Sequence, residues 1–213
     1  MINLIFDYDG TLHNSIKIYA PAFRSAYTYL IEKGIAASKE FSDKEISYWL
    51  GFTAEEMWRC FLPYLSDEEE QKCISLIGRE MINLINKGMA ELYPHAENVL
   101  QKLKDIGYNL IFLSNCKHAY MEAHIKQFQL DRFFSAFYSS EDFGFISKHE
   151  IFHTIKSDWT GDSIIIGDRF HDMEIAEIHK LKSVGCLYGY GTLAELKSAT
   201  WRIEKLSDIL QLL

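Results

Sequence analysis

The feature that most constrains this chain is a long helical stretch that separates one strand-like segment from all the others. Residues 2–6 form an apolar run typical of a buried strand, and helical periodicity then occupies residues 15–90. Strand-like runs return only after that stretch, in alternation with helical segments. They lie at residues 109–113, 133–138, 163–166 and 183–187. Such alternation predicts a parallel sheet with helices packed on it.

Start and stop signals define helices in both parts of the chain. Ser42, Thr53 and Ser66 each stand three residues before a Glu, which is the spacing of a capping box. In the later part, Pro94 is expected as a first helical residue and Gly107 as a helix stop. The early segment therefore reads as all-helical, and the later one as mixed.

These patterns predict an α/β protein whose sheet-containing part is interrupted by a helical insert. We expect the core to comprise residues 1–14 and 91–213, and the insert residues 15–90. The crossings between the two parts, residues 13–16 and 88–92, are hinge candidates. We find no repeats and no low-complexity tracts.

Composition restricts the class of partner. The 213 residues are 48% apolar, enough for a substantial core, and carry 22 Lys plus Arg against 30 Asp plus Glu, a net charge of −8. No basic cluster is long enough to follow a phosphate backbone, so nucleic acid is not an expected partner. An acidic protein that handles an anionic substrate needs local positive charge, from a metal ion, a placed lysine or inward-pointing helix N-termini.

The cysteines and the apolar runs indicate the compartment. Cys60, Cys73, Cys116 and Cys186 form no CxxC pair, so neither a zinc site nor a disulfide framework is expected. Reduced thiols are typical of the cytoplasm. No apolar run approaches membrane-spanning length, and the first residues do not have the pattern of a signal peptide. We therefore expect a soluble cytoplasmic protein that has no membrane partner.

Two carboxylates follow the first strand-like run. Asp7 and Asp9 come directly after residues 2–6, and Gly10 permits a sharp turn behind them. The carboxyl ends of parallel strands are where α/β sheets bind ligands. Two acids beside a glycine turn suit a divalent cation, although Asp and Gly are also the residues of an ordinary surface turn.

Three further polar clusters border later strand-like runs. Ser114 and Asn115 follow one strand, where they can bind a phosphate oxygen or cap a helix. Lys148 follows an irregular stretch and would be unremarkable alone. Asp168 ends another apolar run, and Asp172 lies one helical turn beyond it. A structural role for Asp172 at a helix N-terminus remains open.

In this order the clusters resemble the four motifs of haloacid dehalogenase-like hydrolases. The residues that carry the resemblance are Asp7-Tyr8-Asp9-Gly10-Thr11-Leu12, Ser114-Asn115, Lys148, and Gly167-Asp168 with Asp172. The match covers essentially the whole chain and implies a Rossmann-like core with an inserted cap, here similar to the small helical caps. Tyr93-Pro94 and the segment Tyr188 to Thr192 also resemble the phosphoglycolate-phosphatase-like branch.

The resemblance implies roles for the first two acids. Asp7 is expected to be the nucleophile that takes the phosphoryl group as an aspartyl phosphate, and Asp9 the general acid and then base. It further implies a Mg²⁺ ion held by Asp7, the backbone carbonyl of Asp9, and Asp168. Asp172 would support these ligands from the second layer.

The resemblance also implies a phosphate-binding set. Ser114, Asn115 and Lys148 are expected to cradle the transferring phosphoryl group, and Lys148 also belongs to the catalytic set. The expected activity is Mg²⁺-dependent hydrolysis of a small phosphorylated metabolite. The sequence does not determine the oligomeric state.

Alternative activities remain within the same family. An acid at Asp9 disfavours the dehalogenases, but a sugar-phosphate mutase of the β-phosphoglucomutase kind would retain it. Such mutases typically have a His and an Arg where this chain has Tyr19 and Ala54. The chain also departs from the family pattern at His149, often Pro, and at Arg169, often a small hydroxyl residue. A non-catalytic binding protein on the same fold is the third alternative.

Overall fold

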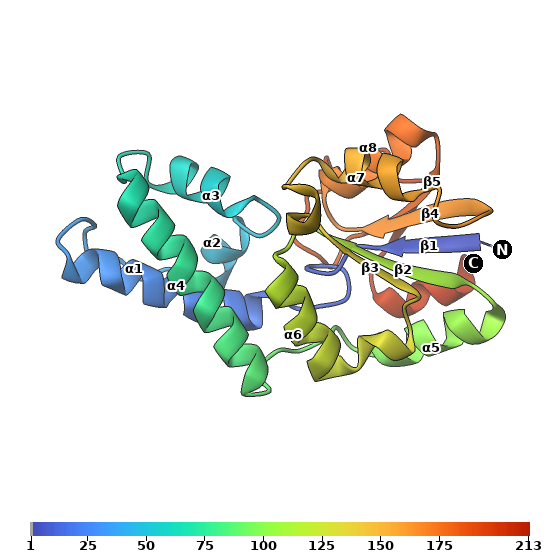
Figure 1. Cartoon of the computed structure of the whole chain (residues 1–213), viewed down its shortest axis with the longest axis horizontal. Helices are drawn as coiled ribbons and strands as arrows, with labels where there is room; N and C mark the ends of the chain where they lie inside the picture. Colours follow the sequence, from blue (N-terminus) through green and yellow to red (C-terminus); the bar gives the residue numbers. More distant parts are fainter. Residues whose placement is uncertain (1) are drawn as a thin grey trace. The chain divides into compact units, whose positions relative to one another are not determined.

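A computed structural model describes residues 2–213, and within them six strands form one parallel sheet in the order β3-β2-β1-β4-β5-β6 (Figure 1). The expected parallel sheet is confirmed. Its strands are β1 (Ile2–Phe6), β2 (Asn109–Ser114), β3 (Ala136–Ser139), β4 (Asp162–Gly167), β5 (Lys182–Cys186) and β6 (Trp201–Ile203). The edge strand β6 was not predicted, because three residues are too short to display a period.

Helices cover both faces of the sheet. The sheet unit contains α5 (Ala96–Ile106), α6 (His118–Phe128), α7 (Lys148–Ile155) and α8 (Phe170–His179), with the short 3-10 helices η1 (Leu130–Arg132), η2 (Glu141–Phe143) and η3 (Leu206–Gln211). In Figure 1, α7 and α8 lie on one face, and α5 and η3 on the other. Ile5 and Ile165 of the sheet pack against Ile151 of α7 in one buried cluster. Alternate strand residues therefore supply the cores of opposite faces.

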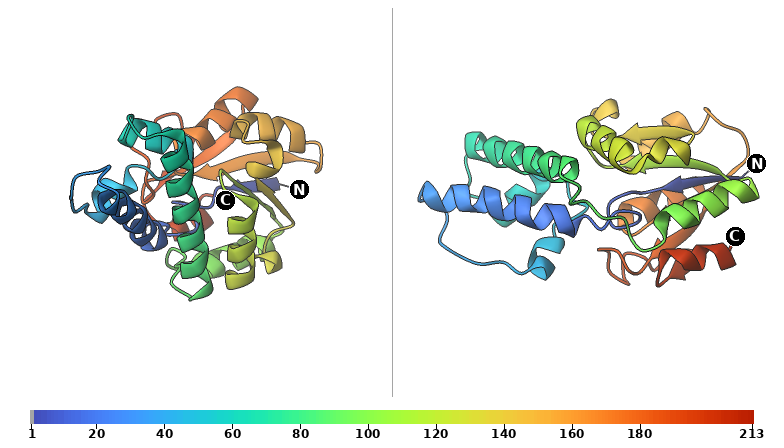
Figure 2. Two further views of the ribbon diagram at one scale, coloured as in Figure 1. Left: turned by 60° about the vertical axis from the view of Figure 1, so that its left-hand side comes forward. Right: turned by 90° about the horizontal axis from the view of Figure 1, so that it is seen from below.

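The described chain divides into two compact units, the residues up to Asn14 with Glu91–Leu213, and Ser15–Ala90. The second unit is all-helical and contains α1 (Ile16–Glu32), α2 (Asp43–Ser47), α3 (Ala54–Phe61) and α4 (Asp67–Asn86). Within it α1 and α4 run side by side (Figure 2). Its core is aromatic: the Phe23 and Trp58 rings are stacked, with planes 8° apart and centroids 6.1 Å apart.

Two of the three expected capping boxes are present, and the third is only half formed. Ser42 and Thr53 form the predicted capping boxes. Ser66 accepts a hydrogen bond from the Glu69 amide, but the Glu69 carboxylate accepts one from the Tyr29 hydroxyl at 2.7 Å instead of reaching back. The local pattern therefore identified that cap but not the tertiary partner that competes for its glutamate.

Two predicted boundaries are wrong. Helix α5 begins at Ala96, not at Pro94, because His95 before it adopts a left-handed conformation with φ 67°. Strand β3 begins at Ala136, not at residue 133. Phe133 and Phe134 instead close the turn after η1, where the Phe134 ring packs edge-on against Phe6 at 6.1 Å. Two buried aromatic residues in a turn therefore gave the apolar pattern that is typical of a strand.

The segments that leave and re-enter the sheet unit are hydrogen-bonded to each other. The Asn14 amide donates to the Glu91 carbonyl at 2.9 Å, and the Tyr93 amide donates to the Leu12 carbonyl at 2.8 Å. His13 and Leu92 form an antiparallel bridge between these bonds. Nowhere in residues 2–213 is a helix long and apolar enough to span a bilayer.

Gly107 ends α5 as predicted, and a substitution there tests the backbone argument. Its φ is +103°, and a Cβ would meet open space. We expect Gly107→Ala to lower the free energy of unfolding by ~1 kcal/mol, because alanine is strained at positive φ. Gly78→Ala is the control, since Gly78 lies inside α4 without positive φ and its Cβ position is also open. It should raise stability, and urea denaturation measures both; equal effects would contradict the argument.

Candidate active site

Two acids lie at the carboxyl ends of adjacent central strands. Asp7 follows β1 and Asp168 follows β4, and these strands pair in register at Phe6 and Ile166. From β1 the sheet continues to β2 on one side and to β4 on the other. The order of strands in the chain reverses here, and open α/β sheets bind ligands at such a point.

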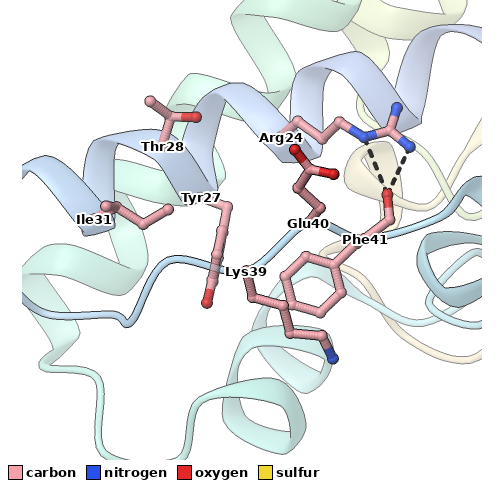
Figure 3. Close-up of a pocket in the computed structure, with 7 residues that line it drawn as sticks. All are labelled: Arg24, Tyr27, Thr28, Ile31, Lys39, Glu40 and Phe41. Atoms are coloured by element: carbon pink, nitrogen blue, oxygen red, sulfur yellow. Dashed lines mark hydrogen bonds between the residues drawn. The ribbon is translucent and has the colours of Figure 1, made fainter.

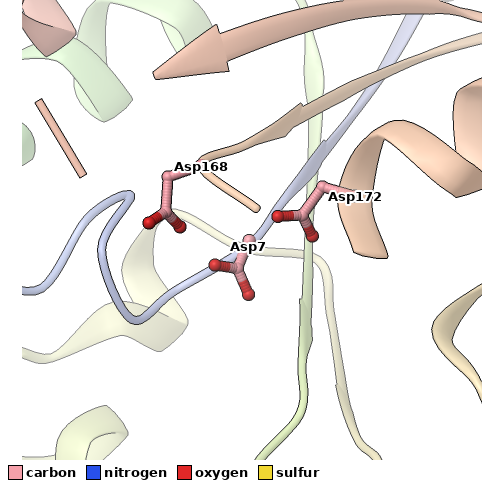
Figure 4. Close-up of side chains that lie close together, drawn as sticks. All are labelled: Asp7, Asp168 and Asp172. Carbon is pink, nitrogen blue, oxygen red and sulfur yellow. The ribbon is translucent and has the colours of Figure 1, made fainter. Parts of the chain in front are cut away.

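A buried cluster of carboxylates forms at this edge. Among the described residues, one oxygen from each of Asp7, Asp168 and Asp172 lies within 4.8 Å of the other two, and all three side chains are buried (Figure 4). Asp172 comes from the first turn of α8, where its Oδ2 accepts a hydrogen bond from the Arg169 amide at 3.1 Å. The helix start thus fixes Asp172, so the structural role left open by the sequence is real.

Lys148 joins the cluster from the first residue of α7. Its Nζ lies 2.5 Å from Asp7 Oδ1 and 2.7 Å from Asp172 Oδ1, and its side chain is 4% exposed. A capping box between Ser147 and Glu150 sets the start of α7. The lysine is therefore held at the site by a helix N-terminus rather than solvated on the surface.

Burial and charge act against each other in this cluster. Burial raises the pKa of Asp7, while the Lys148 ammonium opposes that rise. Burial and then repulsion from Asp172 raise the pKa of Asp168 to about 7. Burial lowers the pKa of Lys148, but attraction to Asp172 and Asp7 outweighs it and the pKa is raised. In the described part of the chain three carboxylates here face one ammonium, and a further cation would relieve the imbalance.

Glycines lie in close contact with Asp168, where no larger residue would fit. A Cβ added to Gly10 or to Gly189 would collide with the Asp168 carboxylate, and one added to Gly191 would collide with its backbone carbonyl. The Tyr190 amide donates to Asp168 Oδ2 at 2.7 Å. The segment Tyr188 to Thr192, noted in the sequence only as a family resemblance, thus positions this acid. Its alternating glycines were the available signal.

The Asp9 carboxylate does not join the acidic cluster. Its Oδ1 accepts hydrogen bonds from the Tyr120 hydroxyl at 2.7 Å and from His13 Nδ1 at 2.9 Å. Its expected place among the metal ligands rested on the backbone carbonyl alone. Sequence analysis missed His13 and Tyr120, as well as Thr11, whose hydroxyl lies 3.4 Å from Asp7 Oδ2 and 3.3 Å from Asp168 Oδ1.

The second polar cluster lies at the end of β2. Ser114 is buried as the last residue of that strand, and Asn115 after it is exposed. Burial raises the pKa of the neighbouring Cys116 thiol, so this cysteine is not an activated nucleophile.

Arg169, which stands where the family often has a small hydroxyl residue, forms an ion pair with Glu195 at 2.8 Å. It is largely buried and does not extend into solvent.

A surface pocket in the helical unit contains none of the predicted site residues. Its lining residues are Arg24, Tyr27, Thr28, Ile31, Lys39, Glu40 and Phe41 (Figure 3). The Arg24 guanidinium is already occupied, because it donates to the Phe41 carbonyl at 2.8 Å and to Asp43 at 2.5 Å. The pocket therefore offers no comparable chemistry.

The family model of haloacid dehalogenase-like hydrolases matches residues 4–186, so the chain belongs to this family. A phosphoglycolate phosphatase from Mannheimia succiniciproducens is 23% identical, over 97% of this chain and 96% of that protein. A 5'-nucleotidase from Pseudomonas aeruginosa is 24% identical, over 92% and 87%. The expected membership of a hydrolase family is confirmed, and these similarities support a phosphoric monoester hydrolase.

Solved structures share the fold over nearly their whole length. A predicted phosphoglycolate phosphatase from Haemophilus somnus has a TM-score of 0.85 at 22% identity, over 99% of this chain and 96% of that one. CbbY from Rhodobacter sphaeroides, solved in complex with phosphate, has a TM-score of 0.78 at 15% identity, over 97% and 95%. The Rossmann-like fold is therefore confirmed.

Substitution of Gly189 tests whether the glycines hold Asp168. We expect Gly189→Ala to lower the free energy of unfolding by about 1–3 kcal/mol, because the added methyl must displace a buried carboxylate. Gly78→Ala is again the control, since neither glycine has positive φ and only Gly189 lacks space for a Cβ. Urea denaturation gives the energies and a crystal structure the position of Asp168. An unmoved Asp168 with unchanged stability would contradict the steric argument.

Proposed function

We propose that this protein is a Mg²⁺-dependent phosphatase that hydrolyses a small phosphate monoester through an aspartyl-phosphate intermediate, similar to phosphoglycolate phosphatases. The observation that carries the proposal is the buried group of Asp7, Asp168 and Asp172 around Lys148. The names of the relatives support the phosphoric monoester as the substrate class.

The proposed reaction has two steps, transfer of the phosphoryl group to Asp7 and hydrolysis of the aspartyl phosphate. A carboxylate oxygen of Asp7 attacks phosphorus and forms a new bond, while the bond from phosphorus to the ester oxygen breaks. Asp9 donates a proton to that oxygen, so the product leaves as an alcohol. Water then attacks phosphorus and gives a proton to Asp9, while the bond between phosphorus and the Asp7 oxygen breaks. Inorganic phosphate leaves, and the Asp7 carboxylate is regenerated.

Lys148 serves both the nucleophile and the phosphoryl group. Its hydrogen bond at 2.5 Å orients Asp7 and favours the charged, nucleophilic form of this carboxylate. The hydrogen bond to Asp172 at 2.7 Å holds the lysine in place. We propose that Ser114 and Asn115, with Lys148, bind the phosphoryl oxygens, because β2 ends beside β1 in the sheet.

The donor set fits Mg²⁺, which prefers oxygen ligands and tolerates few protein groups. We propose Asp7, Asp168 and the Asp9 carbonyl as its ligands. Both Asp172 oxygens already accept hydrogen bonds, from Lys148 and from the Arg169 amide, which favours a supporting role for this acid. When bound, the ion offsets the negative charge that develops on the transferring phosphoryl group.

The helical unit and the free cysteines support proposals about the substrate and the compartment. We propose that residues 15–90 act as the cap that selects the ester, and that the protein works in the cytoplasm, where its free cysteines stay reduced. The mutase alternative is disfavoured by Tyr19 and Ala54, where such mutases have His and Arg. A screen of phosphorylated metabolites with purified protein identifies the substrate.

The nucleophile is tested with p-nitrophenyl phosphate. We expect Mg²⁺-dependent release of phosphate by the wild type and a loss of at least about 1,000-fold in kcat for Asp7→Asn, because an amide oxygen cannot form the intermediate. Asp162→Asn is the matched control, since Asp162 is exposed at the opposite end of β4. Equal activity of Asp7→Asn and the wild type would refute the mechanism, and inactivity of the wild type on all phosphate esters would support the binding-protein alternative.

The cation site is tested by thermal denaturation without substrate. Mg²⁺ at about 100 times its Kd should stabilise the folded protein by about 2.7 kcal/mol, and excess EDTA should reverse the shift in Tm. Asp168→Asn should remove most of this shift, because it replaces a buried charged ligand with a neutral one. Asp162→Asn should keep the shift. The same Mg²⁺ response in all three proteins would place the ion elsewhere.

A further inference from the structure

The surroundings of Asp9 differ from those of the acidic cluster two residues earlier. Two donors converge on one oxygen, Oδ1, from Tyr120 at 2.7 Å and His13 at 2.9 Å. Both donors are buried, whereas the Asp9 side chain keeps 26% of its surface exposed. Oδ1 is therefore anchored by two buried groups, while part of the side chain is exposed.

The two donors are themselves held by packing. The His13 ring stacks on Tyr8 with centroids 5.2 Å and planes 13° apart, and its centroid lies 4.4 Å from that of His124. Tyr120 and His124 are four residues apart on one face of α6, with ring centroids 4.4 Å apart. His124 Nδ1 in turn lies 2.7 Å from the Tyr8 hydroxyl. A buried ring cluster thus joins α6 to the segment that follows β1.

The pKa shifts of the buried rings around Asp9 are consistent with a neutral phenol as the donor from α6. Burial and then the Asp9 charge raise the pKa of Tyr120, so its phenol keeps the proton that it donates. Burial and then His13 lower the pKa of His124 to about 2, so this ring is neutral and adds no charge beside Asp9. Burial also raises the pKa of Tyr8. Tyr120 therefore donates to Asp9 as a neutral phenol.

We propose that Tyr120 and His13 are positioning residues that hold Oδ1 of Asp9, so that the opposite oxygen, Oδ2, carries the proton in the reaction. This proposal rests on the proposed phosphatase function and extends it to residues outside the four motifs. Because Oδ1 accepts two hydrogen bonds, the acid form of Asp9 bears its proton on Oδ2. Proton transfer to the ester oxygen leaves Asp9 as a carboxylate, and the donors stabilise the new charge.

Substrates with different leaving groups can distinguish the positioning of Asp9 from a general contribution to the stability of the fold. An alkoxide is a poor leaving group and needs the proton from Asp9 as its bond to phosphorus breaks. p-Nitrophenolate is stable without that proton. A misplaced Asp9 should therefore slow alkyl phosphates far more than p-nitrophenyl phosphate, whereas a damaged fold slows both alike.

The first experiment measures kcat/KM of Tyr120→Phe for substituted phenyl phosphates and for an alkyl phosphate that the wild type accepts. We expect a loss of about tenfold for the alkyl ester, less than about threefold for p-nitrophenyl phosphate, and a steeper dependence on leaving-group pKa. Tyr138→Phe is the matched control, because its hydroxyl also donates to an aspartate, Asp158, at 2.8 Å. It should leave the leaving-group dependence unchanged.

A second pair of variants tests the other donor. His13→Phe keeps an aromatic ring against Tyr8 but has no donor, and His13→Asn restores an N–H near the position of Nδ1. We expect the first to behave as Tyr120→Phe does and the second to recover most of the alkyl phosphate activity. Equal losses for all esters, or no loss in Tyr120→Phe and His13→Phe, would overturn the proposal.

A crystal structure gives a readout that does not depend on turnover. In the wild type Oδ1 of Asp9 should contact Tyr120 and His13, and in Tyr120→Phe the carboxyl group should rotate or become disordered while Asp7 stays in place. An unmoved Asp9 in that variant would overturn the positioning role. Failure of the proposed function is distinct, since it appears as a wild type without phosphatase activity or as an Asp7→Asn variant with full activity.

Discussion

The ammonium group of Lys148 between the carboxylates of Asp7 and Asp172 is the interaction on which the site depends. It links the end of β1 to the first turns of α7 and α8, three segments that are distant in the sequence. Removal of one partner from a buried ion pair leaves an uncompensated charge, which typically costs about 3–5 kcal/mol. The same contact thus joins the stability of the sheet edge to the position of the proposed nucleophile.

The strand order explains why these residues meet. Because β1 lies between β2 and β4, the residues that follow these three strands come together at the carboxyl ends of the strands. Open α/β sheets bind ligands there. Asp7 and Asp168 follow neighbouring strands, and Asp172 enters from the helix after β4. Close approach then requires glycine at Gly10 and Gly189, where any side chain would occupy the space of Asp168. The close packing around the Asp168 carboxylate therefore explains why glycines occupy these positions.

The sequence predicted the parts of this arrangement that depend on local patterns. Strand ends located Asp7 and Asp168, since apolar runs and the polar residues after them are visible along the chain. Tyr120 was missed because its contact with Asp9 is made across the fold, between residues 111 positions apart. His13 lies only four residues after Asp9, but its contact depends on how the turn behind β1 folds back, which no periodic pattern predicts. Pro94 was misplaced as the first helical residue, because α5 begins only after His95, which adopts a left-handed conformation. Local periodicity predicts helices and strands, whereas the contacts between them are set only when the chain folds.

Two aspartates only two residues apart have environments suited to different work. Asp7 lies among buried charges, and the Lys148 ammonium favours its ionised form, as a nucleophile requires. Asp9 contacts a phenol and an imidazole and retains exposed surface, which fits the proposed exchange of a proton with the substrate. Acid and base roles on one fold generally follow from environments that separate two like groups. Here an ammonium holds one carboxylate and two ring donors hold the other, and that difference assigns the nucleophile and the proton carrier of the proposed reaction.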